Sequence, residues 1–135
     1  MVGSERDVVV AVLLRADRFL VIRRGPGARM PGYWAPPSGV VEAGESRQDA
    51  LVREVREEVG LTAVPSAEVW RSRSADGVSL LHWWTARAEH GEVVPDPREV
   101  AASRWVTAAE FLALDPVFPG DREFFVRVLP RLQGP

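Results

Sequence analysis

The hydrophobic pattern of the chain predicts several strands. Residues 8–15 are mostly β-branched and apolar, which indicates a buried strand, and residues 19–24 complete a hairpin after a short turn. Residues 70–74 and 78–87 flank an Asp-Gly turn and predict a second hairpin. Residues 101–106 predict one more short strand.

The pattern also predicts a helix over residues 46–59. Its apolar stripe, at the spacing of one helix face, consists of Leu51, Val52, Val55 and Val59. Ser46 is a good N-cap residue, and Asp49 three residues later makes a variant of the capping box. Gly60 supplies the stop, because glycine readily takes the left-handed conformation that follows a helix.

Two further helices are expected near the C-terminus. Thr107 is a plausible N-cap for residues 108–113, and Glu110 completes a capping box there. Asp121 is expected to cap a last helix that reaches about residue 129. The residues that this helix should bury are Phe124, Phe125 and Val128. Strands and helices in this order support an α/β fold.

Two segments read as loops. Residues 25–38 hold four Pro and three Gly, so no regular element is expected within them. Residues 89–99 form a second polar loop that contains proline. The first loop leads directly into the predicted helix at residues 46–59, whose charged residues therefore lie close to it in sequence.

Carboxylates are concentrated in and just before this helix. Glu54, Glu57 and Glu58 have the spacing that places side chains on one side of a helix, and Glu45 precedes them. Each close pair of such charges repels by about 3 kcal/mol at an effective dielectric constant of about 20. A compensating cation is therefore expected, and oxygen ligands suit Mg²⁺ or Mn²⁺. The alternative is a solvated helix with surface Glu–Arg pairs.

The segment from Gly39 to Leu61 matches a single motif, G-x5-E-x7-R-E-U-x-E-E-x-G-U, in which U is aliphatic. The fixed positions are Gly39, Glu45, Arg53, Glu54, Val55, Glu57, Glu58, Gly60 and Leu61. This segment resembles the signature of the Nudix hydrolases, and Trp34 and Pro37 resemble the approach to that signature in many members. The resemblance implies a Nudix-type α/β/α sandwich with a mixed β-sheet between helices.

The resemblance also implies a metal site. Glu57 and Glu58 are expected to bind Mg²⁺ or Mn²⁺ together with the backbone carbonyl of Ser38, which stands where members often have glycine. Glu54 is expected as a ligand, a general base, or both. Arg53 is expected to orient a glutamate, and Glu45 to hold Arg53 from outside the metal shell.

Other residues of the site are placed by the same resemblance. Glu99 is the candidate for a further acidic residue near the metal, with Glu110 as the weaker choice; the alternative is that Glu99 is an exposed loop carboxylate. The general base stays open between Glu54, Glu45 and Glu99. Gly39 is expected to be structural for a tight loop and Gly60 for the helix stop.

Candidate substrate contacts lie before the motif. Arg23 and Arg24 could meet phosphate, although a solvated surface pair is an equal alternative. Tyr33 and Trp34 could stack a nucleobase, with core packing as the alternative for the tryptophan. For Trp83 and Trp84, packing in the core is favoured over stacking on a nucleobase. His82 is expected to be structural, and His90 to be exposed in a turn.

Composition limits the class of protein. One domain is expected for residues 1–135, and the apolar content of 46% can fill a core. The absence of cysteine excludes disulfides and thiol chemistry, and a net charge of −2 argues against a nucleic-acid polymer as partner. The apolar run at residues 8–14 is too short for a membrane span, so a cytoplasmic protein is expected. The resemblance allows a homodimer.

The expected reaction is metal-dependent hydrolysis of a nucleoside diphosphate linked to another group. A (deoxy)nucleoside triphosphate or an oxidised nucleotide is the expected substrate, because marks of other Nudix subfamilies are missing. For example, the proline that ADP-ribose members carry beyond the motif is replaced here by residues 75–78. The alternatives are hydrolysis of ADP-ribose, a nucleotide sugar or a dinucleoside polyphosphate, and a nucleotide sensor without catalysis.

Overall fold

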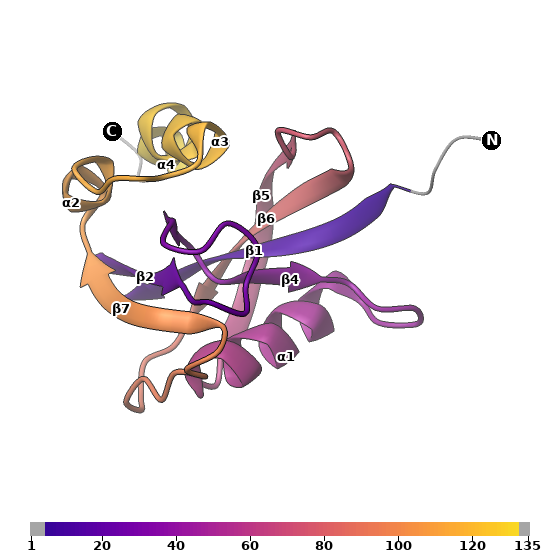
Figure 1. Cartoon of the computed structure of the whole chain (residues 1–135), viewed down its shortest axis with the longest axis horizontal. Helices are drawn as coiled ribbons and strands as arrows, with labels where there is room; N and C mark the ends of the chain where they lie inside the picture. The colour runs from indigo at the N-terminus through magenta and orange to yellow at the C-terminus, as the bar shows by residue number, and fades with distance from the viewer. Residues whose placement is uncertain (1–4, 133–135) are drawn as a thin grey trace.

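The computed structural model describes residues 5–132, so residues 1–4 and 133–135 of the expected domain lie outside it (Figure 1). The strands are β1 (Arg6–Arg15), β2 (Arg18–Arg24), β3 (Trp34–Ala35), β4 (Ser38–Val40), β5 (Val64–Arg73), β6 (Ser79–Arg87) and β7 (Val100–Val106). The helical segments are α1 (Arg47–Val59), α2 (Ala108–Leu112), α3 (Pro119–Glu123), the π-helical η1 (Phe124–Val128) and α4 (Leu129–Leu132).

The strands form one mixed sheet. Its main order is β3-β2-β1-β6-β5, with β4 paired to β1 and β7 paired to β2. The β1–β6 pair is parallel over its whole length, whereas the hairpin pairs β1–β2 and β5–β6 are antiparallel. A parallel pair inside an otherwise antiparallel sheet needs a crossover, and the chain from β1 to β6 runs through β2, β3, β4, α1 and β5. The expected α/β class with a mixed sheet is confirmed.

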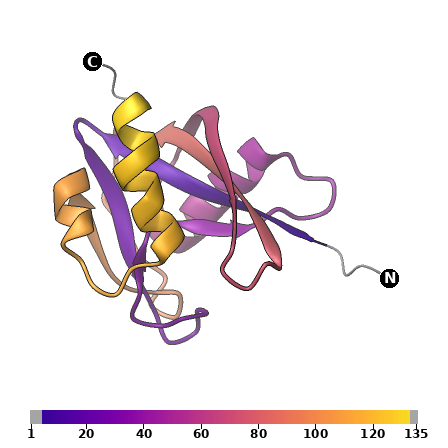
Figure 2. The same cartoon turned by 90° about the horizontal axis from the view of Figure 1, so that it is seen from above.

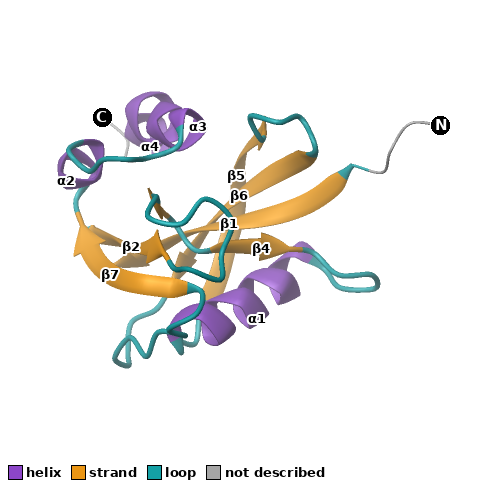
Figure 3. Ribbon diagram, in the orientation of Figure 1, coloured by secondary structure: helices purple, strands orange, loops and turns teal. Residues whose placement is uncertain are grey.

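Helices cover both faces of the sheet. Figures 1 and 3 show α1 on one face, and α2 with the C-terminal helical segments on the other. Figure 2 shows α3, η1 and α4 following one another as a continuous helical rod across the sheet. Successive side chains of a strand point to opposite faces, so β1 sends Val9 and Leu13 toward α1 and Val10 and Val12 toward the rod.

The sequence sets the ends of α1 as expected. The Ser46 hydroxyl accepts a hydrogen bond of 3.0 Å from the Asp49 backbone N–H, which satisfies a free donor at the helix start. Gly60 follows the helix with φ 72°, the left-handed conformation of a helix stop. The buried residues of α1 are Ala50, Leu51, Val55 and Val59. Val52, which the apolar stripe included, is only partly buried.

Two strand predictions were wrong. Residues 25–38 were expected to hold no regular element, but β3 lies inside this segment and β4 begins at its end. β3 has only two residues, and Pro36 and Pro37 lie between the two strands, where no ladder hydrogen bond is lost. The strand expected at residues 70–74 begins much earlier, at Val64. Pro65 is tolerated because β5 ends the main strand order and changes register at this residue.

The C-terminal helix also begins earlier than expected. Asp121 was predicted to be its N-cap, but the N-cap is Phe118 and Pro119 occupies the first helical turn. Proline is favoured there because it has no N–H to satisfy and its φ is already helical. Asp121 therefore lies inside the first turn and is buried. Phe124 and Phe125 are buried as predicted, whereas Val128 is only partly buried. The capping box of Thr107 and Glu110 on α2 is confirmed.

Candidate functional site

The charged side of α1 lies against β4, which enters directly from the proline-rich loop. Gly39 is in β4 opposite Val9 of β1, and its backbone is extended rather than in the tight turn that was expected. A Cβ atom at Gly39 would lie 2.0 Å from Cδ of Glu54. Glycine is needed here because the Glu54 side chain occupies the space of a side chain at residue 39. The strand and the helix together thus fix the position of Glu54.

Arg53 is the centre of a hydrogen-bonded network on this side. Its Nε and Nη2 donate to the two carboxylate oxygens of Glu45, at 2.7 and 2.9 Å. Its Nη1 donates to Glu54 at 2.9 Å and to Glu57 at 3.1 Å. Nη2 also donates to the Val40 carbonyl at 3.0 Å. Arg53 therefore holds two glutamates of α1, the loop before α1, and β4 in one arrangement.

The network makes Glu45 a poor proton acceptor. The hydrogen bonds from Arg53, followed by one from the Glu42 backbone, lower the pKa of Glu45 to about 2. In turn, its hydrogen bonds to Glu45 raise the pKa of Arg53. A carboxylate with so low a pKa and both oxygens bound to one guanidinium is a structural counter-ion. These properties favour Glu54 or Glu99 over Glu45 as the general base.

Glu54 and Glu58 are held in a setting that opposes their ionisation. Burial, followed by the charge of the nearby Glu54, raises the pKa of Glu58 to about 8. Burial also raises the pKa of Glu54, although its hydrogen bond to Arg53 acts in the opposite direction. The Oε1 atom of Glu58 is buried and has no hydrogen-bond partner. Such an atom is costly unless a ligand satisfies it.

These donors fit a divalent cation. An unpartnered buried carboxylate oxygen, with further carboxylates beside it, is a set of hard oxygen ligands of the kind that Mg²⁺ and Mn²⁺ prefer. The candidate ligands do not all point to one position, because the Glu57 side chain is 59% exposed and is bonded to Arg53. Within residues 5–132, no three His, Asp or Glu side chains already surround one metal position. Glu57 would have to leave Arg53 to join Glu58.

Glu99 and Arg24 lie at the same end of the site. The Gly25 N–H donates to the Glu99 carbonyl at 2.8 Å, and Arg24 pairs with Val100 across β2 and β7. The Asp96 N–H donates to the Glu58 backbone carbonyl at 2.9 Å and the Glu99 N–H to the Asp96 carbonyl at 3.1 Å, which ties this loop to the end of α1. Glu99 is partly buried. The structure thus brings Glu99 toward the acidic side chains of α1, while its role as a metal ligand stays a prediction.

Tyr33 and Trp34 lie beside the segment that precedes the C-terminal rod. The Tyr33 ring stacks on Phe118, with centroids 4.6 Å apart. The Trp34 backbone N–H donates to the Pro116 carbonyl at 2.9 Å, and its side chain packs partly buried against the rod-side core. The guanidinium of Arg24 lies 5.8 Å from the Phe118 ring centroid. Phe118 is a member of this group that sequence reasoning did not single out.

Asp121 is the second residue that was missed. It is 7% exposed, and burial raises its pKa to about 7, against the opposing effect of the Arg24 charge. A buried acid with a raised pKa is typical of functional sites. The available signal was Pro119, which is favoured in the first turn of a helix and so places Asp121 inside that turn rather than at the cap.

The other predicted residues lie outside this group. Trp83 is fully buried and stacks on Phe124 at 4.4 Å, and Trp84 packs partly buried on the α1 side. His82 is buried, with Nε2 2.8 Å from an Asp7 oxygen and Nδ1 3.4 Å from Glu68. Glu110 accepts hydrogen bonds from the Thr107 backbone N–H and from the Arg18 side chain, so its role is structural. The remaining two residues, Arg23 and His90, are exposed.

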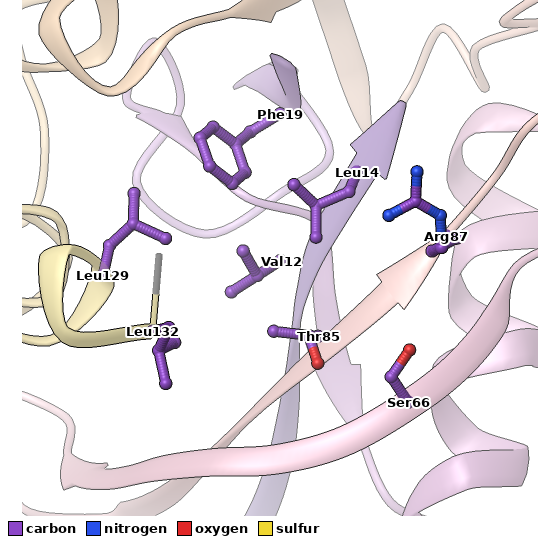
Figure 4. Close-up of a pocket in the computed structure, with 8 residues that line it drawn as sticks. All are labelled: Val12, Leu14, Phe19, Ser66, Thr85, Arg87, Leu129 and Leu132. Atoms are coloured by element: carbon purple, nitrogen blue, oxygen red, sulfur yellow. The ribbon is translucent and has the colours of Figure 1, made fainter. Parts of the chain in front are cut away.

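A separate pocket of about 190 Å³ lies between α4 and the sheet (Figure 4). It is lined by Val12, Leu14, Phe19, Ser66, Thr85, Arg87, Leu129 and Leu132. Its floor is apolar and no carboxylate lines it, so it offers no ligand for a hard cation. We therefore regard the pocket as the open end of the rod-side core and place the candidate site at α1.

Comparison with known proteins identifies the family. The NUDIX domain model matches residues 4–128. A Mycobacterium tuberculosis protein described as a candidate 8-oxo-dGTP diphosphatase 2 is 35% identical over 130 residues, covering 94% of this chain and 90% of the relative. The CTP pyrophosphohydrolase of Escherichia coli is 33% identical over 117 residues, covering 85% of this chain and 84% of that protein.

A solved structure shows the same fold. The MutT protein of Methanosarcina mazei superposes with a TM-score of 0.80, at 24% identity, over 97% of this chain and 96% of that chain. The chain belongs to the NUDIX family and is a Nudix hydrolase. Nudix hydrolases generally use divalent metal ions such as Mg²⁺ and act on small nucleotides. No helix in residues 5–132 has the length and apolarity needed to cross a membrane.

Proposed function

We propose that this Nudix hydrolase is a Mg²⁺- or Mn²⁺-dependent pyrophosphohydrolase of a (deoxy)nucleoside triphosphate, including an oxidised one. The observation that carries the proposal is the buried, unpartnered Oε1 of Glu58 among other carboxylates. The names of the two relatives, one for an oxidised deoxyguanosine triphosphate and one for CTP, support a triphosphate substrate. We also propose that residues 1–135 form one cytoplasmic domain, which the family match over residues 4–128 supports.

The acidic side chains would hold the metal. Glu54, Glu57 and Glu58, with the Ser38 carbonyl and Glu99, are the proposed ligands. A bound divalent cation would neutralise phosphate oxygens and lower the pKa of a bound water. Arg53 keeps Glu54 oriented, and Glu45 keeps Arg53 in place. Glu54, whose pKa is raised, is suited to take the proton of the attacking water.

The other end of the site would bind the nucleotide. Arg24 would meet phosphate or the base, and the exposed Arg23 beside it would meet the outer phosphates. Tyr33 and Trp34 would border the base, with the Tyr33 ring stacked on Phe118. Asp121 would contact a base edge: its protonated form can donate a hydrogen bond and its ionised form can accept one.

A hydrolysis panel tests the proposed reaction. The wild-type chain is incubated with Mg²⁺ or Mn²⁺ and with nucleoside triphosphates, 8-oxo-dGTP, ADP-ribose, nucleotide sugars and diadenosine polyphosphates, and the products are separated by chromatography. We expect a nucleoside monophosphate and pyrophosphate from a triphosphate. If only ADP-ribose or only a dinucleoside polyphosphate were cleaved, the proposed triphosphate substrate would be wrong. Metal-dependent binding without any turnover would favour a nucleotide sensor.

The role of Asp121 gives a pH-dependent prediction. We expect Asp121→Asn to raise KM for the preferred triphosphate about tenfold or more while kcat changes little, because one base-edge hydrogen bond is altered. We also expect the wild-type KM to change between about pH 6 and pH 8, around the Asp121 pKa of about 7, and the variant KM to lose this dependence. Asp17→Asn, in an exposed turn, is the control.

The same substitution should change stability with a definite sign. The folded pKa of Asp121, about 7, lies above its ordinary value of 3.8, so the folded state binds the proton more tightly. The stability from this proton is fully present below about pH 3.8 and is lost as pH rises through about 7. The free energy of unfolding of Asp121→Asn, relative to that of the wild type, should therefore rise by up to about 4 kcal/mol between pH 4 and pH 8. Urea unfolding measures this difference. An equal pH dependence in both proteins would contradict this assignment.

A further inference from the structure

Arg15 is the last residue of β1, and its side chain binds the start of the loop that joins β6 to β7. Its Nε donates to the Ala88 carbonyl at 2.6 Å, Nη2 to the His90 carbonyl at 2.8 Å and Nη1 to the Gly91 carbonyl at 2.9 Å. The guanidinium carbon also lies 4.6 Å from the ring centroid of Trp105 in β7. One side chain therefore fixes three backbone carbonyls of a segment that belongs to no helix or strand.

The middle of the same loop is bonded to the C-terminal end of α1. The Val94 N–H donates to the Val59 carbonyl at 2.8 Å, and the Asp96 N–H donates to the Glu58 carbonyl at 2.9 Å. The last carbonyls of a helix have no partner within the helix, so the loop supplies the missing donors. Gly60 leaves space for this contact, because a Cβ atom there would lie 3.1 Å from the Val94 Cβ atom. Figure 1 shows the loop beside this end of α1.

The last part of the loop carries Glu99 and is held by a turn. The Asp96 carbonyl accepts hydrogen bonds from the N–H groups of Glu99, at 3.1 Å, and Val100, at 2.8 Å. The Gly25 N–H donates in turn to the Glu99 carbonyl at 2.8 Å. Glu99 is thus held between the turn that is bonded to α1 and the start of the proline-rich loop. Its position therefore depends on where the whole loop of residues 89–99 lies.

We propose that Arg15 is a positioning residue of the active site, which holds the loop of residues 89–99 against the end of α1 and so keeps Glu99 in place. Arg15 contacts neither metal nor substrate and acts only through the loop. The inference rests on the proposed function, because it takes Glu99 as a residue of the metal site. It adds to that function a residue of β1 that determines where Glu99 lies.

The contacts explain why this position requires arginine. A planar guanidinium has five N–H donors in a fixed fork, so it reaches three carbonyls at once while it lies over the Trp105 ring. Lysine would keep the charge, but its single ammonium group cannot reproduce the fork. Arg18, in the same hairpin, is the matched control, because its exposed side chain binds Glu110 of α2 at 3.0 Å and not the loop.

Amide hydrogen exchange of the metal-free chain tests the positioning without any measurement of activity. We expect the N–H groups of Val94 and Asp96 to exchange about tenfold faster in Arg15→Gln than in wild type, because the loop leaves α1 more often. The N–H of Ala11, bonded to a carbonyl inside the sheet, should keep its wild-type rate, and Arg18→Gln should match wild type throughout. Unchanged exchange at Val94 and Asp96, or an equal rise at Ala11, would overturn the proposal.

Kinetics test whether the loop acts through Glu99. With the substrate that the hydrolysis panel identifies, we expect Arg15→Gln to lower kcat about tenfold and to change KM less. Arg15→Lys, which disturbs folding less, should lower kcat about threefold. In a Glu99→Gln background, Arg15→Gln should cause little further loss, because the side chain that it positions has already been replaced. A purely structural role of Arg15 would instead give losses that multiply.

The same variants separate failure of this inference from failure of the proposed function. A Glu99→Gln enzyme with the wild-type kcat would remove Glu99 from the proposed site, and this inference with it. A large loss in Glu99→Gln, together with multiplying losses in the double variant or a wild-type kcat in Arg15→Gln, would overturn this inference alone.

Discussion

Replacing Glu58 by Gln is expected to lower kcat about a thousandfold without destabilising the fold. The buried Oε1 of Glu58 has no partner in the protein, and the proposed metal is the group that would satisfy it. A catalytic metal contributes several kcal/mol to the transition state, which corresponds to about this loss in rate. Gln has nearly the same shape and no charge to bury. Urea unfolding at pH 7 should therefore show unchanged or slightly higher stability.

The control for this prediction is Glu92→Gln, which removes an exposed carboxylate from the loop before β7. Its kcat should be that of the wild type. Isothermal titration with Mg²⁺ should show weakened binding for Glu58→Gln and normal binding for Glu92→Gln. A Glu58→Gln enzyme with full activity would remove Glu58 from the metal site, and the acidic cluster would need another explanation.

Replacing Arg53 by Gln is expected to have the second-largest effect, on both stability and rate. Arg53 donates to Glu45, Glu54, Glu57 and the Val40 carbonyl, and it is only one-quarter exposed. Without it, partly buried carboxylates are left facing one another. Breaking a fully buried pair costs about 3–5 kcal/mol, so about 2–3 kcal/mol is expected here. Because Glu54 loses its orientation, kcat should also fall about a hundredfold.

Arg53→Lys distinguishes geometry from charge. A lysine ammonium cannot reproduce the fork that reaches two carboxylates and a carbonyl, so it should recover only part of the stability. The low pKa of Glu45, about 2, gives stability that is present above its ordinary value of 4.5 and lost as pH falls toward 2. This acid-dependent part should disappear in Arg53→Gln, as measured by unfolding between about pH 5 and pH 2. Full recovery by lysine would show that only the charge matters.

The acidic half of the site could be predicted from sequence because it is local. Glu54, Glu57 and Glu58 share one helix whose cap and stop are readable, and Arg53 reaches Glu57 within one turn. The partnership of Arg53 and Glu45 was also expected. Other features of this half depend on packing. Examples are the room that Gly39 makes for Glu54 and the burial of the Glu58 Oε1 atom.

The nucleotide half could not be predicted in the same way because its residues come from distant segments. Tyr33 and Arg24 both come near Phe118 only after the C-terminal rod has packed on the sheet. Asp121 looked like a helix cap because Asp is common there, whereas Pro119 starts the helix earlier. The strand expected at residues 70–74 begins at Val64, because Pro65 is accepted at an edge position with a register shift.

The most direct test of the central claim is the position of the metal. Mn²⁺ is added in substoichiometric amounts to the isotope-labelled chain, and line broadening of backbone amide signals is followed by NMR. We predict broadening first at Ser38, Gly39, Glu57, Glu58 and Glu99, with the signals of Thr85 and Leu129 beside the apolar pocket unchanged. Broadening centred elsewhere, or none at concentrations that support hydrolysis, would contradict a metal site formed by α1, β4 and Glu99.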